Sequence, residues 1–276
     1  MAIFLPRRWR SQPQYVCQVD FAHPLAAGLI EYTLVTPQGL VSAAGQLSVE
    51  GGTTPTEPYY QPAGVGRRHK AASPATSYVY ASGRGPSRTV DAYTLYARAQ
   101  WLGGATSAPT SFATGRNVYG IALETPVAGM RGVGIAQSGE PNGRTWAGAI
   151  TLGANRTTGV VTAGASVRDI FLYRPSGDIH TLQIIGVATT GTSSADSTSF
   201  TATGLFAYQG VLTATSAPGD KVLFVGGFWE RVLTLAERLA IAENPWQLFV
   251  PLQRRIYFDF GGGAAGSTDL MPQICL

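Results

Sequence analysis

The chain has 276 residues, a formal net charge of +4 and only 13% charged residues, together with 34 glycines and 17 prolines. This length suits one large all-β domain with extensions better than two small domains, and the glycines and prolines indicate frequent turns. The basic residues are almost all arginine, because Lys70 and Lys221 are the two lysines. Such a bias favours planar, paired contacts at protein interfaces, although a GC-rich gene would produce it too.

Targeting signals and a disulfide framework are not expected. Cys17 and Cys275 lie near opposite ends of the chain, and two cysteines are too few for such a framework. The N-terminal charges follow a short apolar patch, which is the reverse of a secretory signal. No stretch approaches the roughly 20 apolar residues of a membrane helix. We therefore expect a soluble protein with no membrane contact that is not secreted by the usual route.

Residues 1–20 are too short for a domain and are predicted to form an extended N-terminal arm. The arm either packs on its own domain or docks on a neighbouring subunit. Its basic and apolar side chains are the candidate assembly contacts there: Phe4, Leu5, Arg7, Arg8, Trp9 and Arg10.

The first part of the main domain, predicted over residues 21–260, combines strands with a long loop. Alternating apolar residues over 29–34 predict a strand, and 41–49 a weaker one. Residues 50–76 are rich in proline and glycine and are predicted to be a long loop, which tends to be functional. The basic run from Arg67 to Lys70 could attract an acidic partner, but a nucleic-acid site is not expected because no basic face or binding fold accompanies it.

Between residues 77 and 228, short apolar runs recur between turn-forming clusters. In the run 92–102, Tyr93, Leu95, Ala97, Ala99 and Trp101 share one face. Strands at this spacing, without crossover helices, predict an antiparallel sandwich. The predicted strands cover 77–81, 92–102, 118–123, 132–136, 145–152, 170–173, 180–188, 204–208 and 222–225.

One helix is predicted over 234–244. Thr234 and Glu237 are spaced as a capping box, and Asn244 before Pro245 ends the helix. Leu235, Leu239 and Ala242 would line its apolar face and pack on the sheet, while Arg238 would fall outside that face. After it, residues 261–276 form a predicted glycine-rich tail whose candidate assembly contacts are Leu270, Met271 and Ile274.

Several of these segments resemble known proteins. Tyr93-Thr-Leu-Tyr-Ala-Arg-Ala99, His180-Thr-Leu-Gln-Ile-Ile185 and Val222-Leu-Phe-Val-Gly-Gly227 resemble core strands of concanavalin A-like, or laminin-G-like, jelly-roll domains. The segment from Phe228 to Phe249, with Arg254-Arg-Ile-Tyr-Phe-Asp259, is similar to jelly-roll proteins of tailed bacteriophages and prophages. Residues 35–88 depart from that pattern. The resemblance implies an antiparallel jelly-roll sandwich with one short C-terminal helix and extended terminal arms.

No catalytic constellation is found in the sequence. Retaining glycosidases need two carboxylates about 5 Å apart, and no predicted strand carries such a pair. The histidines do not have metal-ligand spacing, so we expect no metal, no cofactor and no enzymatic activity. Sugars could still stack on exposed aromatic rings. The candidates are Trp101, Tyr119 and Trp146, which would otherwise fill the sandwich core.

The sequence therefore favours a non-enzymatic structural protein of a tailed-phage virion, either a capsid decoration or a tail-associated component. It would be assembled in the host cytoplasm, with other virion proteins as partners in an oligomeric assembly. The alternative is a glycan- or receptor-binding virion module that contacts a glycan of the host surface.

Overall fold

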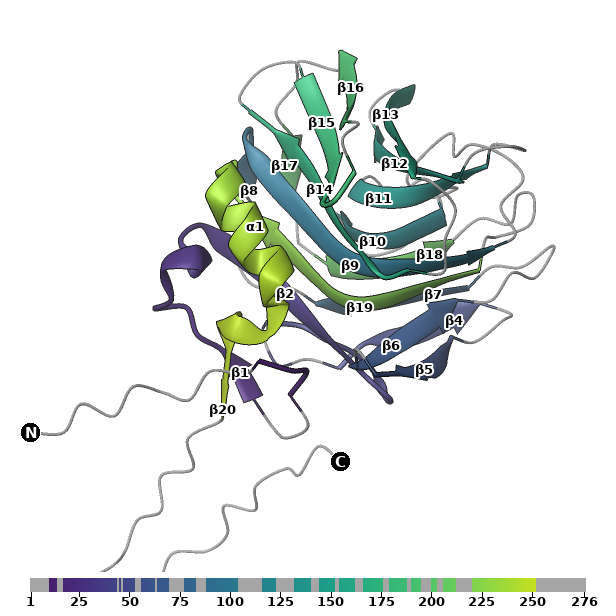
Figure 1. Ribbon diagram of the computed structural model, residues 1–276, viewed down its shortest axis with the longest axis vertical. Coiled ribbons are helices and arrows are strands. Elements are labelled where there is room, and N and C mark those ends of the chain that lie inside the picture. The colour runs from purple at the N-terminus through teal and green to yellow at the C-terminus, as the bar shows by residue number, and fades with distance from the viewer. Residues whose placement is uncertain are drawn as a thin grey trace, which may run out of the picture.

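The protein is an all-β antiparallel sandwich with one short α-helix, as predicted (Figure 1). The fold is known from a computed structural model. It describes residues 10–13, 17–43, 45, 47–52, 56–62, 64–69, 77–82, 88–103, 116–122, 132–139, 144–151, 154–161, 166–175, 179–187, 190–194, 200–202, 206–211 and 220–251.

Within these residues, nine strands form the larger sheet. Its main path is β16 (Thr190–Ser194), β15 (Ile179–Ile184), β14 (Arg168–Arg174), β9 (Tyr93–Gly103), β19 (Asp220–Trp229), β2 (Leu29–Thr36) and β3 (Gly39–Val41). A branch of two further strands, β6 (Gly64–His69) and β5 (Glu57–Gln61), pairs with β19 through β6.

Seven of the described strands form the facing sheet. Their order is β13 (Ala154–Val161), β12 (Arg144–Thr151), β11 (Gly132–Gly139), β10 (Arg116–Ala122), β18 (Phe206–Val211), β7 (Ser77–Ser82) and β4 (Val49–Gly52). Two small ribbons pair β1 (Cys17–Val19) with β20 (Phe249–Pro251) and β8 (Arg88–Val90) with β17 (Phe200–Ala202). The helical elements are η1 (Pro24–Ala26), α1 (Leu235–Glu243) and η2 (Pro245–Leu248).

The space between the sheets is filled by one apolar cluster. The alternate residues Tyr93, Leu95, Ala97 and Ala99 of β9 are fully buried in it, with Trp101 partly buried, which confirms the predicted inward face. Residues of β10 and β11 meet them from the other sheet. At Gly226 of β19 an added Cβ would lie 2.5 Å from the ring of Tyr119, so a side chain there would prevent this close approach of the sheets.

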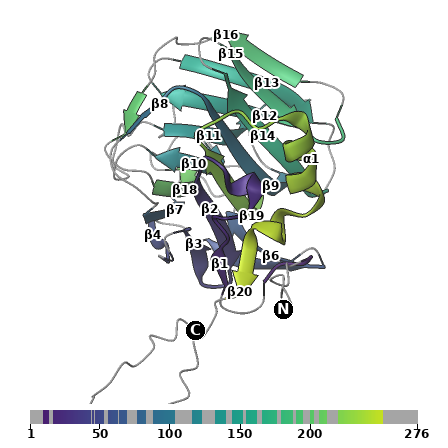
Figure 2. The ribbon, with the colours of Figure 1, turned by 90° about the vertical axis from the view of Figure 1, so that its left-hand side faces the viewer.

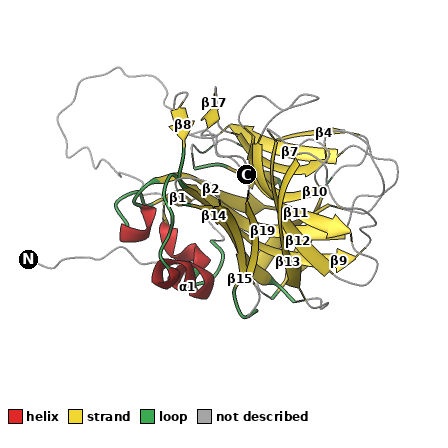
Figure 3. Ribbon diagram, turned by 90° about the horizontal axis from the view of Figure 1, so that it is seen from above, coloured by secondary structure: helices red, strands yellow, loops and turns green. Residues whose placement is uncertain are grey.

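A second apolar cluster covers the opposite, outer face of the nine-stranded sheet. There α1 and η2 lie beside β14 and β19, on the side away from β10, β11 and β12 (Figures 2 and 3). Buried residues of the sheet in this cluster include Tyr96, Phe171 and Trp229, and Ile241 and Trp246 meet them from above. The sheet is therefore packed on both faces beneath the helix.

The helix has the predicted bounds but not the predicted face. Thr234 and Asn244 cap it, and the capping box with Glu237 is present. Ala242 is buried as predicted, but Leu235 and Leu239 are 52% and 47% exposed, so the predicted apolar stripe was wrong at both leucines. Arg238 and Ile241 are buried in their place. Arg238 is inside because its guanidinium lies 4.3 Å from the centre of the Tyr173 ring and donates to the Leu233 carbonyl and to Gln183 Oε1.

All nine strands predicted between residues 77 and 228 have counterparts in the structure. The long loop predicted over 50–76 was wrong in part, because it contains the end of β4 and all of β5 and β6. The weaker strand predicted over 41–49 is replaced by β3, which ends at Val41, and β4, which begins at Val49. No helix in the described part of the chain is long and apolar enough to span a membrane.

The predicted N-terminal arm is part of the domain where it is described. Cys17 pairs with Pro251 and Val19 with Phe249 in the β1–β20 ribbon, and Asp20 N donates to Leu248 O at 2.8 Å. Burial raises the pKa of the Cys17 thiol to about 11, which favours the unreactive thiol form. Most of residues 1–20 and the predicted tail 261–276 lie outside the described residues.

Candidate binding surface

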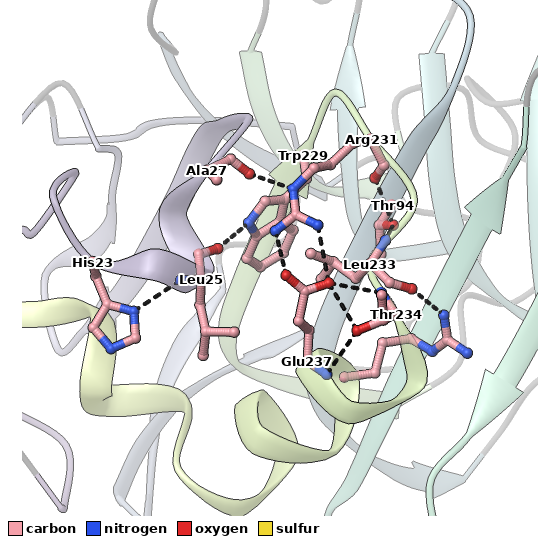
Figure 4. Close-up of polar contacts among 10 residues, drawn as sticks. His23, Leu25, Ala27, Thr94, Trp229, Arg231, Leu233, Thr234 and Glu237 are labelled. Carbon is pink, nitrogen blue, oxygen red and sulfur yellow. Dashed lines mark hydrogen bonds and ion pairs between the residues drawn. The ribbon is translucent and has the colours of Figure 1, made fainter.

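The densest polar network joins the chain that leaves β19 to η1 and α1 (Figure 4). Arg231 donates to Ala27 O at 2.6 Å and to the two carboxylate oxygens of Glu237 at 2.6 and 2.9 Å. Glu237 also accepts from Thr234 N at 2.8 Å. The bond to Arg231 is the main reason that the pKa of Glu237 falls to about 2. The network ties the start of the helix to η1.

Further hydrogen bonds next to this network hold residues 229–249 on the outer face of the nine-stranded sheet. We call residues 229–249 the closing segment. Trp229 Nε1 donates to Leu25 O at 2.7 Å, and the Thr94 hydroxyl donates to Arg231 O and accepts from Leu233 N. These polar groups bond to one another and to the backbone, which stabilises the fold. These bonds therefore hold the closing segment on β9 and η1.

At the other end of β19 the sheet forks. β19 pairs with β2 over residues 225–229 and with β6 over residues 221–223. The amide of Gln12, a residue that is 4% exposed, bridges the two arms of the fork. Its nitrogen donates to Val35 O at 2.8 Å and to Val65 O at 2.9 Å, and its oxygen accepts from Val65 N. The fork fixes the β5–β6 hairpin on the sheet.

Glycine allows the hairpin to lie close to its surroundings. A Cβ at Gly66 would collide with the side chain of Val222, and one at Gly64 would collide with the amide of Gln12. Gly64 also has a φ of 129°, a conformation that other residues rarely adopt. Gly66 pairs with Tyr59 and Gly64 with Gln61 of β5, so neither Tyr59 nor Gln61 has a side chain directly opposite it on β6.

On the outer face of the sheet, the face that also carries α1, Arg68 holds the hairpin to β19. Arg68 donates to Asp220 Oδ1 at 2.9 Å and Oδ2 at 2.5 Å, and to Glu57 Oε1 at 3.3 Å. The hydrogen bonds to Asp220 are the largest reason that the pKa of Arg68 is raised. Arg67, next along β6, is buried and donates to Thr56 Oγ1 and to Pro37 O. Of the two arginines, Arg68 is the one on the outer side.

Alternation along β5 places polar and aromatic groups beside Arg68. Tyr59 is half-buried, with its ring centre 5.9 Å from the Arg68 guanidinium carbon, and Gln61 Nε2 donates to Gln100 Oε1. Tyr60 alternates to the other side of the strand and is 67% exposed. We define the hairpin surface as the outer group of residues: Glu57, Tyr59, Gln61, Arg68, Gln100 and Asp220.

The structure describes the side chains of two of the three aromatic residues predicted to stack on sugars, Trp101 and Tyr119. Tyr119 is fully buried, and its hydroxyl lies 3.0 Å from Thr33 Oγ1, so its proposed sugar-stacking role was wrong. Trp101 is half-buried and packs against the core between the sheets. Trp146 lies in β12, and its side chain is outside the described residues.

Of the residues predicted to make assembly contacts, the structure describes only Arg10. Arg10 is exposed, whereas Phe4, Leu5, Arg7, Arg8, Trp9, Leu270, Met271 and Ile274 lie outside the described residues. Among the residues that the structure does describe, no group of three or more histidine, cysteine or acidic residues could hold a metal ion.

Sequence reasoning missed the hairpin surface because it treated residues 50–76 as one loop. One signal was present: Glu57, Tyr59 and Gln61 alternate on one side of a short segment that turns at Pro62 and returns with Arg68. This pattern was not recognised as a strand, because Tyr59 lies between the polar residues Glu57 and Gln61 instead of between apolar ones. In addition, Arg68 and Asp220 are 152 residues apart in the sequence. That pairing could not be inferred from local patterns.

No protein-family model matches the sequence, and no curated protein matches it either. The fold is similar to that of several solved structures. The binding domain of Paraclostridial Mosquitocidal Protein 1 has a TM-score of 0.51 at 10% identity, over 79% of this chain and 52% of that chain. The binding domain of botulinum neurotoxin DC, in complex with SialylT, has a TM-score of 0.51 at 9% identity, over 80% of this chain and 52% of that chain.

A third similar structure is the ligand-binding domain of botulinum neurotoxin serotype D, in complex with N-acetylneuraminic acid. Its TM-score is 0.51 at 8% identity, over 79% of this chain and 52% of that chain. The present chain therefore spans about half the length of these structures. At such identities the likeness shows a shared β-sandwich fold.

Proposed function

We propose that the protein is a glycan- or receptor-binding module and that the hairpin surface is its binding site. The observation that carries this proposal is the position of Tyr59, a half-buried aromatic ring that packs against the outer apolar cluster and lies beside Arg68, on the side of β5 that also carries Gln61. An aromatic floor with a few placed polar groups is the usual composition of a small-ligand site.

The shared fold supports this proposal. The similar toxin domains are named as binding domains, and two of them are described in complex with a sialylated ligand or with N-acetylneuraminic acid. The support is an analogy of fold, so the residues of the hairpin surface carry the chemical argument.

A glycan array tests this function. The intact protein should bind a subset of oligosaccharides, and Tyr59→Ala should abolish that binding. Tyr60→Ala is the matched control, because it removes the same side chain from the opposite side of the same strand. Binding that survives Tyr59→Ala but not Tyr60→Ala would place the site on the other side of β5. If the intact protein binds no glycan, the proposed glycan-binding function is wrong.

We further propose that the module has no enzymatic activity. The proposal is motivated by the sequence, which lacks a pair of carboxylates on one predicted strand. On the described hairpin surface the two carboxylates, Glu57 and Asp220, both bond to Arg68. Incubation with a broad panel of polysaccharides should release no reducing ends. Reproducible cleavage that disappears when one acidic residue is changed would contradict this proposal.

A second candidate function is a structural role in a tailed-phage virion, after assembly in the host cytoplasm. It is supported by the resemblance of the segment from Phe228 to Phe249 to phage jelly-roll proteins. Other virion proteins would then be partners through residues 1–16 and 261–276. A chain lacking residues 1–9 and 261–276, which keeps Gln12 and its bonds to Val35 and Val65, should fold normally but fail to enter particles. Normal incorporation of that chain would place the assembly contacts elsewhere.

A further inference from the structure

A titratable side chain holds the start of η1. His23 immediately precedes η1, and its ring nitrogen Nδ1 accepts from Leu25 N at 3.0 Å (Figure 4). A histidine that accepts through Nδ1 is neutral and has its proton on Nε2, because both ring nitrogens of an imidazolium are donors. We infer that His23 makes the contact between η1 and the closing segment sensitive to pH, firm when the ring is neutral and weaker when it is protonated.

Leu25 connects the histidine to the closing segment. Its N–H donates to His23, and its carbonyl accepts from Trp229 Nε1 at 2.7 Å. Two residues further on, Ala27 O accepts from Arg231 Nε at 2.6 Å. The turn that His23 caps therefore presents both of the carbonyls that receive these side chains of the closing segment.

Protonation of His23 would weaken this turn without removing it. The proton on Nδ1 would face the N–H of Leu25, so a hydrogen bond would be replaced by two opposed donors. The backbone bonds from Ala26 N to His23 O and from Ala27 N to Pro24 O do not involve the ring and would remain. The expected change is thus a local loosening of η1 and of its contacts.

The other charged side chains on the elements that contact η1 titrate elsewhere. Among the described residues they are Asp20, at the start of the same turn, and Glu230, Arg231 and Glu237 of the closing segment. An imidazole ordinarily titrates near pH 6.5, a carboxyl near pH 4 and a guanidinium above pH 12. The bond to Arg231 lowers the pKa of Glu237 to about 2. The imidazole is therefore the group of this contact that changes charge near neutral pH.

The elements below η1 add no group that titrates in this range. Residues 245–251 of η2 and β20 carry no ionisable side chain, and burial raises the pKa of the Cys17 thiol in β1 to about 11. The other two histidines of the chain, His69 and His180, are buried in β6 and β15. Comparison of variants at one pH cancels their contribution.

His23→Asn is the decisive variant. Asparagine is a strong N-cap residue that offers an acceptor to the Leu25 N–H and has no proton to gain. The bond to His23 is present above about pH 6.5 and is lost as the pH falls below it. At pH 7.5 hydrogen exchange of the Trp229 indole N–H should be equal in the parent and in His23→Asn. At pH 5.5 it should be roughly fivefold faster in the parent, which is the effect of one N-cap of about 1 kcal/mol.

Two controls accompany this comparison. His23→Ala lacks the cap at every pH, so its Trp229 indole should exchange faster than that of His23→Asn at both pH values. The indole of Trp246, in η2, should exchange equally in the parent and in His23→Asn at pH 5.5. Equal exchange of Trp229 in these two proteins at both pH values would overturn the inference. Equal acceleration of Trp229 and Trp246 would overturn it too, because His23 would then act on the whole fold rather than on the contact with η1.

An NMR titration of the intact protein tests the hydrogen bond without a variant. The His23 ring should carry its proton on Nε2 at pH 7.5, and the Leu25 amide signal should shift with the same midpoint as the ring signals. This measurement also decides the case in which asparagine does not replace the cap. A Leu25 signal that stays constant while His23 titrates would contradict the inference.

Discussion

The outer face of the nine-stranded sheet has two halves, one covered by the closing segment and one beside the β5–β6 hairpin. The strands β9 and β19 both extend through the two halves. Over one half, the closing segment covers Thr94, Tyr96 and Arg98 with apolar side chains and buried hydrogen bonds. Beyond it, Gln100 meets the polar side chains of the β5–β6 hairpin. The same two strands thus support a second hydrophobic core and, beyond the helix, a partly exposed polar surface whose Tyr59 packs against that core.

Because of this difference, we expect the covered half to determine the stability of the fold and the hairpin surface to determine binding. Burial of apolar area and satisfied polar groups stabilises the covered half, whereas partly exposed ion pairs such as those of Arg68 contribute little to stability. Changes under the closing segment should therefore lower stability, and changes on the hairpin surface should alter binding. Four variants or conditions can break or sharpen that comparison.

The largest effect is expected from Ile241→Ala, which removes a fully buried side chain between α1 and the sheet. Loss of buried contacts and the cavity left behind should lower the free energy of unfolding by about 2–5 kcal/mol. Leu239→Ala is the control on the same helix. Leu239 is 47% exposed, so its change should stay within about 0.5 kcal/mol. Urea denaturation measures both, and equal effects would mean that the helix is not docked through Ile241.

Gln12→Ala should have the next largest effect. The variant leaves the polar groups of Val35 and Val65 at the fork without their amide partner, which should cost about 1–3 kcal/mol. Gln18→Ala, a change at an exposed residue of β1, controls for loss of a glutamine. Hydrogen exchange should accelerate in β6 before the strands beneath the helix. Uniform acceleration throughout the sheet would show that the hairpin and the covered half unfold together.

Acid should weaken the covered half through Glu237. The folded pKa of this carboxyl is about 2, compared with 4.5 for the unpaired group. Its contribution to stability is therefore complete above about pH 4.5 and is lost as the pH falls through about 2. In Glu237→Gln this contribution is absent at every pH, so the difference in urea midpoint from the parent should shrink between pH 6 and pH 2. A constant difference would exclude the Arg231–Glu237 pair as its source.

The smallest change in stability is expected from Glu57→Gln on the hairpin surface. The Glu57 side chain is 37% exposed and its contact with Arg68 is 3.3 Å long, so the free energy of unfolding should change by less than about 0.5 kcal/mol. The same variant should nevertheless alter binding at the proposed site. A large loss of stability would show that the contact between Glu57 and Arg68, in addition to the pair between Arg68 and Asp220, is needed to keep the hairpin folded.

The covered half was largely predictable because its signals are local. The capping residues Thr234 and Glu237 and the pair Asn244-Pro245 set the helix bounds, and apolar alternation set the inward face of β9. The face of the helix that packs on the sheet was not predictable, because the burial of Arg238 depends on the Tyr173 ring and on Gln183. A helical pattern of leucines alone placed the wrong side chains on the sheet.

The open half was not predictable, because its elements are defined by distant partners. β5 and β6 carry few apolar residues, and their strands are stabilised by β19 and by Gln12, which is 53 residues from Val65. Trp101 and Tyr119 stood out in the sequence as large aromatic residues, but their strands direct them toward the core. Tyr59 is less conspicuous in the sequence, and its position depends on the register with Gly66.

The β1–β20 ribbon also determines how the protein would respond to a mechanical pull. Cys17 pairs with Pro251 and Val19 with Phe249, so the first and last described strands lie side by side as an antiparallel pair (Figure 1). A force that separates the two ends would first load the Gln12 bonds to Val35 and Val65, because Gln12 precedes Cys17 in the chain. Once these bonds break, the ribbon would open one residue pair at a time, from Cys17 inward, rather than load all its hydrogen bonds together.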